Sequence, residues 1–400
     1  MTTAASNLSL RSGTRSGSVL AAHSTVIDGP FELLDDASPD GFVWLDGDHG
    51  FVASGVAATV APADAAAFLA SIGRWSGDAR LSERAGPRAV GALPFHGSDH
   101  LVVPALIVGR DADGRAWRTV IDDTDAPRLA SAVPRPAPVP SEFRVSALTT
   151  RAEWCAMVDD ALEHIAHGAL EKVVLARAVR IDADHDFDVR AILAFLRRSQ
   201  PGCIVYGDRG LVGASPELLV RKSGADVTSR PLAGTGLDRA ALGSSKIERE
   251  HRLVVDAVVT ALRAGCADVR ADGPAPLDLA DVTHLATSVT ARVDPASTSI
   301  ADLVAALHPT PAVAGTPRDR ALETIDALES VPRGRYAGPC GWIDRNGDGE
   351  FLVALRGADV DGSHALLHAG AGIVAGSDPE AEWLETQQKL TPMLQALVRP

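Results

Sequence analysis

Three ionisable residues near the C-terminal end of the chain have the spacing of neighbours on one helix face. Glu382, Glu385 and Lys389 are separated by three and then four positions, so a helix places their side chains in one row. Residues 377–379, Ser-Asp-Pro, precede them with the cap residues and first-turn proline that begin helices. The pattern allows two interpretations: a solvated face with a Glu385–Lys389 pair, or carboxylates that hold a hard cation such as Mg²⁺.

The segment before this helix is rich in glycine. Residues 368–376 read His-Ala-Gly-Ala-Gly-Ile-Val-Ala-Gly, a composition that disfavours a helix interior. Such a segment suits a place where the backbone must come close to another group. If the carboxylates that follow hold a cation, this segment would form a glycine-lined floor beside it.

Two further ionisable residues lie in or beside predicted strands. Lys172 stands in the apolar strand predicted for residues 170–181, so it is either at a sheet edge or desolvated with a lowered pKa, which would make it a usable base. Glu217 follows Ser-Pro where another strand is predicted to begin. A buried glutamate with a raised pKa is a common general acid, and a purely structural carboxylate is the alternative.

The composition is that of a soluble globular protein. The chain has 400 residues, 46% hydrophobic and 22% charged, which allows a large core. A net charge of −14 argues against nucleic acid or an anionic membrane as partner, and a small anionic substrate would need local cations. Four scattered cysteines without metal-binding spacing favour a reduced, cytoplasmic setting and no zinc site.

Neither a membrane span nor a secretory signal is recognisable. No apolar run approaches the roughly 18 residues that a membrane helix needs. The start of the chain is rich in Ser, Thr and Ala and lacks an apolar signal core, so residues 1–25 are expected to form a disordered tail.

Eight short stretches occur in a fixed order between residues 143 and 397. They are Lys172-Val-Val-Leu-Ala-Arg, Ser215-Pro-Glu217-Leu-Leu, Arg230-Pro-Leu-Ala-Gly-Thr, Glu250-His251, His284-Leu-Ala-Thr, His308-Pro-Thr-Pro-Ala-Val-Ala-Gly-Thr-Pro, Arg335-Tyr336-Ala-Gly and the final glycine-and-acid segment. Together they resemble the chorismate-utilising enzymes, and within them the isochorismate synthases of the siderophore type.

The resemblance implies an α/β (α+β) fold in a single large domain. Two stacked, mostly antiparallel sheets with outer helices are expected, as in anthranilate synthase and its relatives. Residues 26–400 would form one chorismate-binding catalytic domain, in which 26–140 match the family loosely and 143–397 form the core. The proline-rich connector at residues 131–140 would then be a crossover connection inside that domain and not a boundary between two domains.

The resemblance also implies a reaction and its cofactor. Chorismate, a dianion, would become isochorismate in the presence of Mg²⁺, as water adds at C2 and the C4 hydroxyl leaves. By family position, Lys172 activates the water and Glu217 protonates the departing hydroxyl. Glu250 and Glu385 would bind Mg²⁺ directly, and Glu382 would support it through water.

The same resemblance assigns substrate contacts. Tyr336, Arg356 and the N–H groups of Gly370 and Gly372 would grip the enolpyruvyl carboxylate, and Lys389 would offset the charge that remains at the metal site. The other implied pocket residues are Gly234 and Thr235 near the ring hydroxyl, His284 in the wall, and Ala312.

Three hypotheses follow. Ala312 favours isochorismate synthase over salicylate synthase, a relative that also releases pyruvate and typically carries Thr at this position. A catalytically silent chorismate-binding homologue is supported only by Ile247, which stands where relatives usually carry an acid. The residues Gly315-Thr-Pro317 favour siderophore supply over menaquinone, and the family suggests a monomer.

Overall fold

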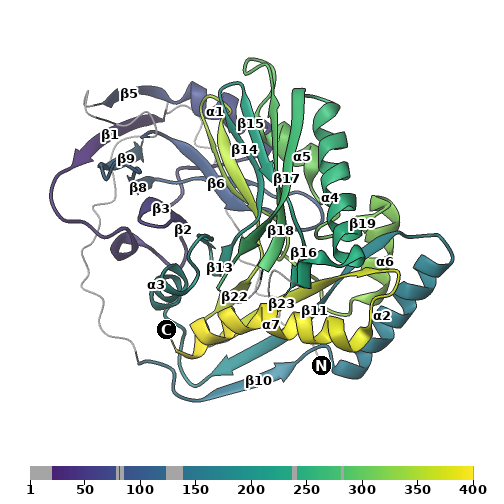
Figure 1. The fold of residues 1–400 in the computed structure, drawn as a ribbon. Helices are drawn as coiled ribbons and strands as arrows, with labels where there is room; N and C mark the ends of the chain where they lie inside the picture. Colours follow the sequence, from purple (N-terminus) through teal and green to yellow (C-terminus); the bar gives the residue numbers. More distant parts are fainter. Residues whose placement is uncertain are drawn as a thin grey trace.

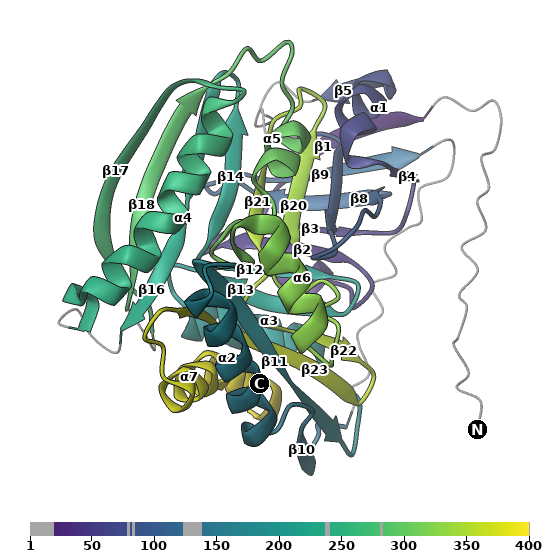
Figure 2. The same ribbon diagram turned by 90° about the vertical axis from the view of Figure 1, so that its right-hand side faces the viewer.

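Two large β-sheets surrounded by helices make up the protein (Figures 1 and 2). The computed structural model describes residues 20–77, 81, 85–122, 138–236, 241–280 and 283–399, without the side chains of residues 74–77, 122, 235, 236 and 241.

The first sheet contains β11 and β23, the two strands on which the site is built. Within the described residues its strand order is β10 (Phe143–Ala147), β11 (Lys172–Ala183), β23 (His364–Val374), β22 (Gly357–Asp361), β13 (Leu211–Ser215), β12 (Ile204–Asp208), β2 (Phe42–Asp46), β3 (His49–Ser54), β8 (Leu106–Arg110), β9 (Ala116–Asp122), β1 (Ala21–Ile27) and β5 (Gly73–Gly77), with β19 (Gly315–Thr316) beside β11. Its neighbouring strands are antiparallel except β1 and β5, which are parallel.

The second sheet is antiparallel throughout its described pairs. Its strand order is β16 (Leu232–Gly236), β18 (Thr283–Arg292), β15 (Asp226–Arg230), β14 (Leu218–Ser223), β21 (Gly349–Val353), β20 (Pro339–Asp344), β6 (Arg88–Ala92), β7 (Leu101–Val103) and β4 (Ala58–Val60), with β17 (Ala267–Asp278) beside β18. The acidic turn at residues 344–349 joins β20 to β21 as a plain hairpin.

Helices cover both sheets. They are α1 (Ala65–Ser71), α2 (Arg151–Ala166), α3 (Val189–Ser199), α4 (Ser245–Arg263), α5 (Ile300–Leu307), α6 (Arg318–Leu328) and α7 (Pro379–Val398), with short 3-10 turns η1 (Leu33–Asp36), η2 (Pro62–Asp64) and η3 (Ala241–Gly243). The last helix, α7, runs along β23 at the bottom of Figure 1 and also packs on α2 and α3. On the second sheet, α4 packs against β16, β17 and β18.

The pairing of β11 with β23 brings together segments about half the chain apart. Their register runs without a break from Lys172 opposite Val374 to Asp182 opposite His364. After β23 the chain turns into α7, where the Asp378 side chain accepts the Ala381 N–H at 2.8 Å as a helix cap. The helix start predicted at residues 377–379 is therefore confirmed.

Two contacts from β11 set the position of α7. The Arg177 guanidinium lies 3.9 Å from the ring centroid of Trp383 and donates to Thr386 Oγ1 at 2.6 Å. Both partners lie on α7, so the helix can neither slide nor rotate without losing a cation–π contact and a hydrogen bond. Glu385, between them in the chain, is thereby fixed relative to the start of β11.

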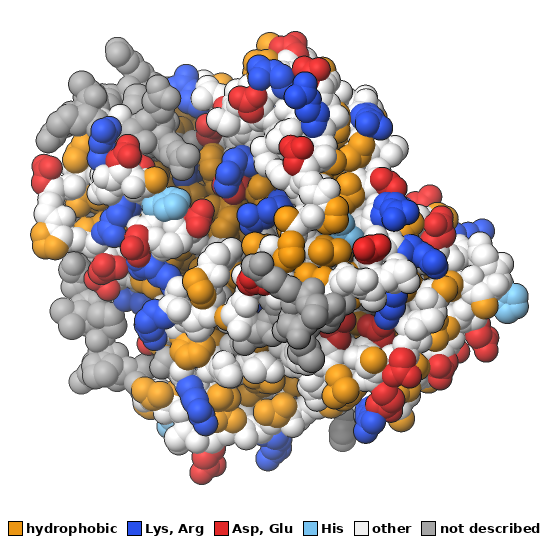
Figure 3. Space-filling model, viewed as in Figure 1, with side chains coloured by type: hydrophobic (Ala, Val, Ile, Leu, Met, Phe, Trp, Pro, Cys, Tyr) orange, Lys and Arg blue, Asp and Glu red, His pale blue; other side chains and the backbone are white. Residues whose placement is uncertain are grey.

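One hydrophobic cluster joins the two sheets. Phe51 of β3, Leu101 of β7 and Ile373 of β23 belong to it, so residues from before and after the proline-rich connector share a core. The predicted α/β fold with two stacked, mostly antiparallel sheets is confirmed. The surface in Figure 3 intersperses basic and acidic side chains over the described part of that face.

The start of the chain is more ordered than the sequence predicts. Residues 21–25 were expected in a disordered tail but form most of β1, because they pair with β9 along one edge and β5 along the other. Residues 1–19, and residues 131–137 of the proline-rich connector, lie outside the described residues. None of the described helices combines the length and apolar character needed to cross a bilayer.

Candidate active site

Lys172 opens β11 and lies inside the sheet. Val374 of β23 lies on one side of it and Thr316 of β19 on the other. The lysine side chain is 1% exposed, and Nζ lies 3.0 Å from Glu250 Oε1. The edge position considered from the sequence is therefore excluded, and Lys172 is a buried amine with a carboxylate beside it.

Glu217 lies in the short link between β13 and β14. Ser215 Oγ donates to the Val353 carbonyl at 2.6 Å and accepts the Glu217 N–H at 3.3 Å, which fixes this link. Glu217 is 4% exposed, and burial raises its pKa from 4.5 to about 8, with the positive charge of Lys172 as the strongest opposing influence. The carboxyl is therefore protonated at neutral pH and lies within electrostatic reach of Lys172.

The carboxylates predicted to bind metal lie on two helices. Glu250 comes from α4 and Glu385 from α7, and both line one cavity. Glu385 Oε1 lies 2.7 Å from Lys389 Nζ. Glu382 is outside that lining: it is buried, and Lys246 Nζ lies 2.7 Å from its Oε1. Burial and the charge of Glu385 both raise the Glu382 pKa, so these two carboxylates lie close together.

This arrangement suits a small hard cation. Among the residues that the structure describes, no group of three or more His, Cys, Asp or Glu side chains gathers as a ready-made metal site. Two carboxylates, Glu250 and Glu385, nevertheless line the same cavity, and each has a lysine Nζ within 3.0 Å. Mg²⁺ is typically held by one or two protein carboxylates and completes its shell with water and substrate oxygens.

Two glycines of β23 form the floor beside these carboxylates. A Cβ atom on Gly372 would lie 2.3 Å from Glu250 Oε1 and 3.0 Å from Lys172 Cε. A Cβ atom on Gly370 would lie 3.3 Å from the Tyr336 hydroxyl, and the Gly370 carbonyl accepts from Lys389 Nζ at 2.9 Å. The glycine-lined floor predicted from the sequence is present, and glycine is required there for close approach.

Replacement of Gly372 by alanine is expected to lower the catalytic efficiency, kcat/KM, about 10–100-fold, because the added methyl displaces Glu250 and Lys172. Steady-state kinetics measure the effect. Gly265→Ala is the matched control, since nothing lies within 4 Å of the Cβ it would add. Equal kinetics for both variants would show that the close packing on Gly372 has no functional weight.

The predicted substrate residues surround one cavity of about 770 Å³, part of it open to solvent. Those that line it are Glu217, Gly234, Glu250, His284, Ala312, Tyr336, Arg356, Gly370, Gly372, Glu385 and Lys389. Lys172 and Glu382 are not part of this lining; Lys172 pairs with Glu250, which is, and Glu382 pairs with Lys246. Thr235 pairs through its backbone with His284, but its side chain is outside the described part of the chain.

His284 and Arg356 form a buried polar pair in the wall. The Arg356 guanidinium lies 3.1 Å from His284 Nε2. Burial and the positive charge of Arg356 lower the His284 pKa well below its ordinary value, so the imidazole is neutral and accepts from the guanidinium. His284 thereby orients Arg356, which keeps its positive charge for an anionic ligand.

Ile247 occupies space against the cavity wall. A Cβ atom on Gly234 would lie 2.5 Å from Ile247 Cγ2. The residue before it, Lys246, has a different partner and donates a hydrogen bond to Glu382. The position where the resemblance led us to expect an acid is thus an apolar contact with a glycine of the cavity wall.

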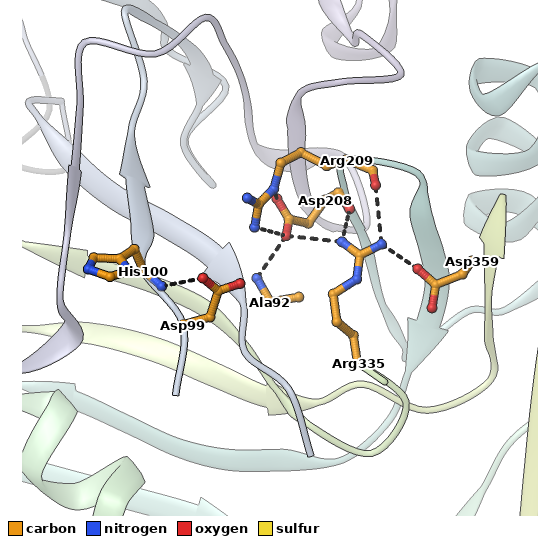
Figure 4. A network of polar contacts seen from close by, with 7 residues as sticks. All are labelled: Ala92, Asp99, His100, Asp208, Arg209, Arg335 and Asp359. Carbon is orange, nitrogen blue, oxygen red and sulfur yellow. Dashed lines mark hydrogen bonds and ion pairs between the residues drawn. The ribbon is translucent and has the colours of Figure 1, made fainter. Parts of the chain in front are cut away.

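Tyr336 is held in the cavity by the residue before it. Arg335 donates to the main-chain oxygens of Asp208 at 2.6 Å and Arg209 at 3.1 Å, and pairs with the Asp359 carboxylate (Figure 4). The Asp208 carboxylate is buried and binds both arginines. This network ties the loop that carries Tyr336 to the turn between β12 and β13.

Two ionisable residues of the lining were missed from the sequence, Arg333 and His368. Arg333 donates to the Val313 and Val174 carbonyls, both at 2.7 Å. His368 opens the glycine segment of β23. The two-residue period of a strand carries a signal for His368, because positions 368, 370 and 372 share one face; no local pattern marks Arg333.

Comparison with known proteins fits this geometry. Residues 95–398 match the protein family described as "Chorismate binding enzyme". The chain belongs to this family of chorismate-binding enzymes. Isochorismate synthase DhbC of Bacillus subtilis is 32% identical over 396 residues, covering 91% of this chain and 95% of the relative. The salicylate biosynthesis isochorismate synthase of Pseudomonas aeruginosa is 39% identical over 263 residues, covering 62% of this chain and 55% of the relative.

Solved structures give the same result. MenF, the menaquinone-specific isochorismate synthase of Escherichia coli, superimposes with a TM-score of 0.82 at 28% identity, covering 96% of this chain and 95% of MenF. Anthranilate synthase component I of Streptococcus pneumoniae, at 22% identity and a TM-score of 0.67, shares the fold. The predicted resemblance of this chorismate-binding enzyme to isochorismate synthases is confirmed.

Proposed function

We propose that this chorismate-binding enzyme is an isomerase that converts chorismate to isochorismate in the presence of Mg²⁺. One observation carries the proposal: a single site combines a carboxyl that is protonated at neutral pH, Glu217, with a buried amine, Lys172. Exchange of a hydroxyl between two ring positions needs a proton removed from water and a proton given to the departing hydroxyl.

Each of the two residues takes one of these steps. Glu217 gives its proton to the C4 hydroxyl. Burial raises the pKa of this carboxyl to about 8, so the proton is still present at neutral pH. Lys172 accepts a proton from the water that adds at C2, a step that requires its amine to be in the neutral form when the substrate is bound. A proton-transfer group in such a step is worth about 10²–10⁴ in rate.

The remaining cavity residues bind the dianion. Glu250 and Glu385 would hold Mg²⁺, which supplies positive charge for the ring carboxylate. Arg356 and the Tyr336 hydroxyl, with the N–H groups of Gly370 and Gly372, take the enolpyruvyl carboxylate. Lys389 lies between the end of the cavity that would hold Mg²⁺ and the end that takes the enolpyruvyl carboxylate. It bonds to Glu385 and to the Gly370 carbonyl.

Removal of divalent cations with EDTA is expected to abolish isochorismate formation, and added Mg²⁺ to restore it, because Glu250, Glu385 and a dianionic substrate repel one another without a cation. Chromatography of chorismate incubated with the purified protein measures this. Failure to form isochorismate in the presence of Mg²⁺ would refute the proposed isomerase activity. Full turnover in EDTA would refute the requirement for a divalent cation. A lactate-dehydrogenase-coupled assay tests the alternative, since a salicylate synthase would release pyruvate.

We further propose that the product supplies siderophore synthesis and that the enzyme acts as a cytoplasmic monomer. The relatives named DhbC and salicylate biosynthesis isochorismate synthase support siderophore supply. A deletion strain should then regain growth under iron limitation with 2,3-dihydroxybenzoate or salicylate. Rescue by menaquinone instead would contradict siderophore supply. Size-exclusion chromatography tests whether the enzyme is a monomer.

A further inference from the structure

His368 is a cavity residue to which the proposed mechanism gives no role. It lies on β23 on the same face as Gly370 and Gly372, whose missing side chains form the floor. Gly372 lies at the carboxylate end, beside Glu250, and His368 lies four residues away at the other end. The histidine is 6% exposed, so its polar atoms are almost fully removed from bulk water.

One ring nitrogen of His368 has no partner within the described protein. Nε2 is buried and makes no hydrogen bond there. The Pro332 carbonyl bonds to the imidazole, while burial and the nearby charge of Arg333 lower the His368 pKa to about 4. The ring is therefore neutral at physiological pH. With its proton on the Pro332 side, Nε2 is left as an acceptor that needs a donor from the cavity.

The position of the ring indicates which part of the substrate it serves. The imidazole stacks on Tyr336, with centroids 5.3 Å apart and planes 18° from parallel. Tyr336 is one of the groups assigned above to the enolpyruvyl carboxylate. A neutral Nε2 and a carboxylate both offer lone pairs, so they cannot bond directly, whereas one water molecule can donate to both.

We propose that His368 is a substrate-positioning residue, whose Nε2 accepts a hydrogen bond from an ordered water that donates its other proton to the enolpyruvyl carboxylate. The proposal rests on the proposed function for the identity of the ligand. It gives the buried nitrogen its missing partner and adds a contact at the cavity end away from Glu250 and Glu385.

The test is chorismate affinity in His368→Phe, which keeps a flat ring on Tyr336 and removes the acceptor. Affinity is measured by calorimetry with Mg²⁺ in proteins that also carry Glu217→Gln, so that turnover does not interfere. Kd is expected to rise about threefold to tenfold, the value of one hydrogen bond. His368→Gln, which restores an acceptor, is expected to bind more tightly than His368→Phe. With Glu217 intact, KM should rise while kcat stays within about twofold.

His364→Phe is the matched control, since this exposed histidine of β23 bonds to Asp182 outside the cavity; its Kd should not change. A change of less than about twofold in His368→Phe overturns the proposal. So does a Kd that rises only together with a fall in unfolding temperature, which would indicate a structural role. Wild-type protein that binds chorismate without turnover refutes the isomerase and leaves the Kd comparison decisive, while protein that binds no chorismate overturns both.

Discussion

Replacement of Glu217 by glutamine is expected to lower kcat by about 10²–10⁴ and at the same time to stabilise the fold. Glutamine has the shape of glutamic acid and can still accept the Leu232 N–H that bonds to the carboxyl. It has no proton to give to a departing hydroxyl. The variant should therefore bind chorismate and fail to convert it, which chromatography and calorimetry measure together.

The stabilisation follows from the direction of the pKa shift. Glu217 has a pKa of about 8 in the folded protein against an ordinary value of 4.5. Between these values the folded state keeps a proton that the unfolded state has released, so stability falls as pH rises through this window. Glutamine removes that dependence. We expect a gain on the order of a few kcal/mol at pH 8 and little gain near pH 4.

Thermal unfolding at pH 5 and pH 8 measures this gain, and the wild-type kcat/KM should decline above about pH 8 as Glu217 loses its proton. Glu350→Gln is the control: that buried carboxylate pairs with Arg221 and lies outside the cavity. It should retain activity and gain no stability. A Glu217→Gln protein with wild-type turnover would remove the general acid from the mechanism.

Replacement of Lys172 by methionine is expected to lower kcat by about 10²–10⁴, because the proposed mechanism assigns to this amine the removal of a proton from the attacking water. Methionine fills a similar volume without the amine. Lys172→Arg is expected to be equally inactive, since a guanidinium does not deprotonate at accessible pH. Chromatography of the product formed over several hours can detect residual turnover that is slower than the wild type by this factor.

The chain offers a closely matched control in Lys222. This lysine is also fully buried and also pairs with a carboxylate, Asp348, at 2.6 Å, but it lies on the second sheet away from the cavity. Both methionine variants should lose about 1–3 kcal/mol of stability through the carboxylate left unpaired. Only Lys172→Met should lose turnover; loss of turnover in both variants would point to a general effect of destabilisation.

The network around Asp208 shows how far pocket geometry depends on distant parts of the chain. Arg335 fixes the Tyr336 loop by bonding to the β12–β13 turn, more than a hundred residues earlier in the sequence. The Asp208 carboxylate in turn accepts the Ala92 N–H of β6 at 3.0 Å. The N-terminal part, which matches the family only loosely in sequence, thus supports the loop that carries a cavity residue.

Local sequence patterns determined the elements. The apolar run of β11 and the cap and proline that begin α7 could both be predicted because backbone propensity acts over a few residues. The ordered motifs indicated the family and therefore the two-sheet fold. The spacing of Glu382, Glu385 and Lys389 predicted one helix face, and α7 does carry them at that spacing.

Only the tertiary structure decided which groups these residues contact. The helix spacing could not show that Glu385 lines the cavity while Glu382 turns to Lys246, because Lys246 comes from α4. Whether Lys172 was at an edge or buried depended on β19 and β23, which follow it by more than 140 and 190 residues. Arg333 and the unpartnered nitrogen of His368 emerged for the same reason: burial, pKa and hydrogen-bond partners are set by neighbours in space, which no window of sequence contains.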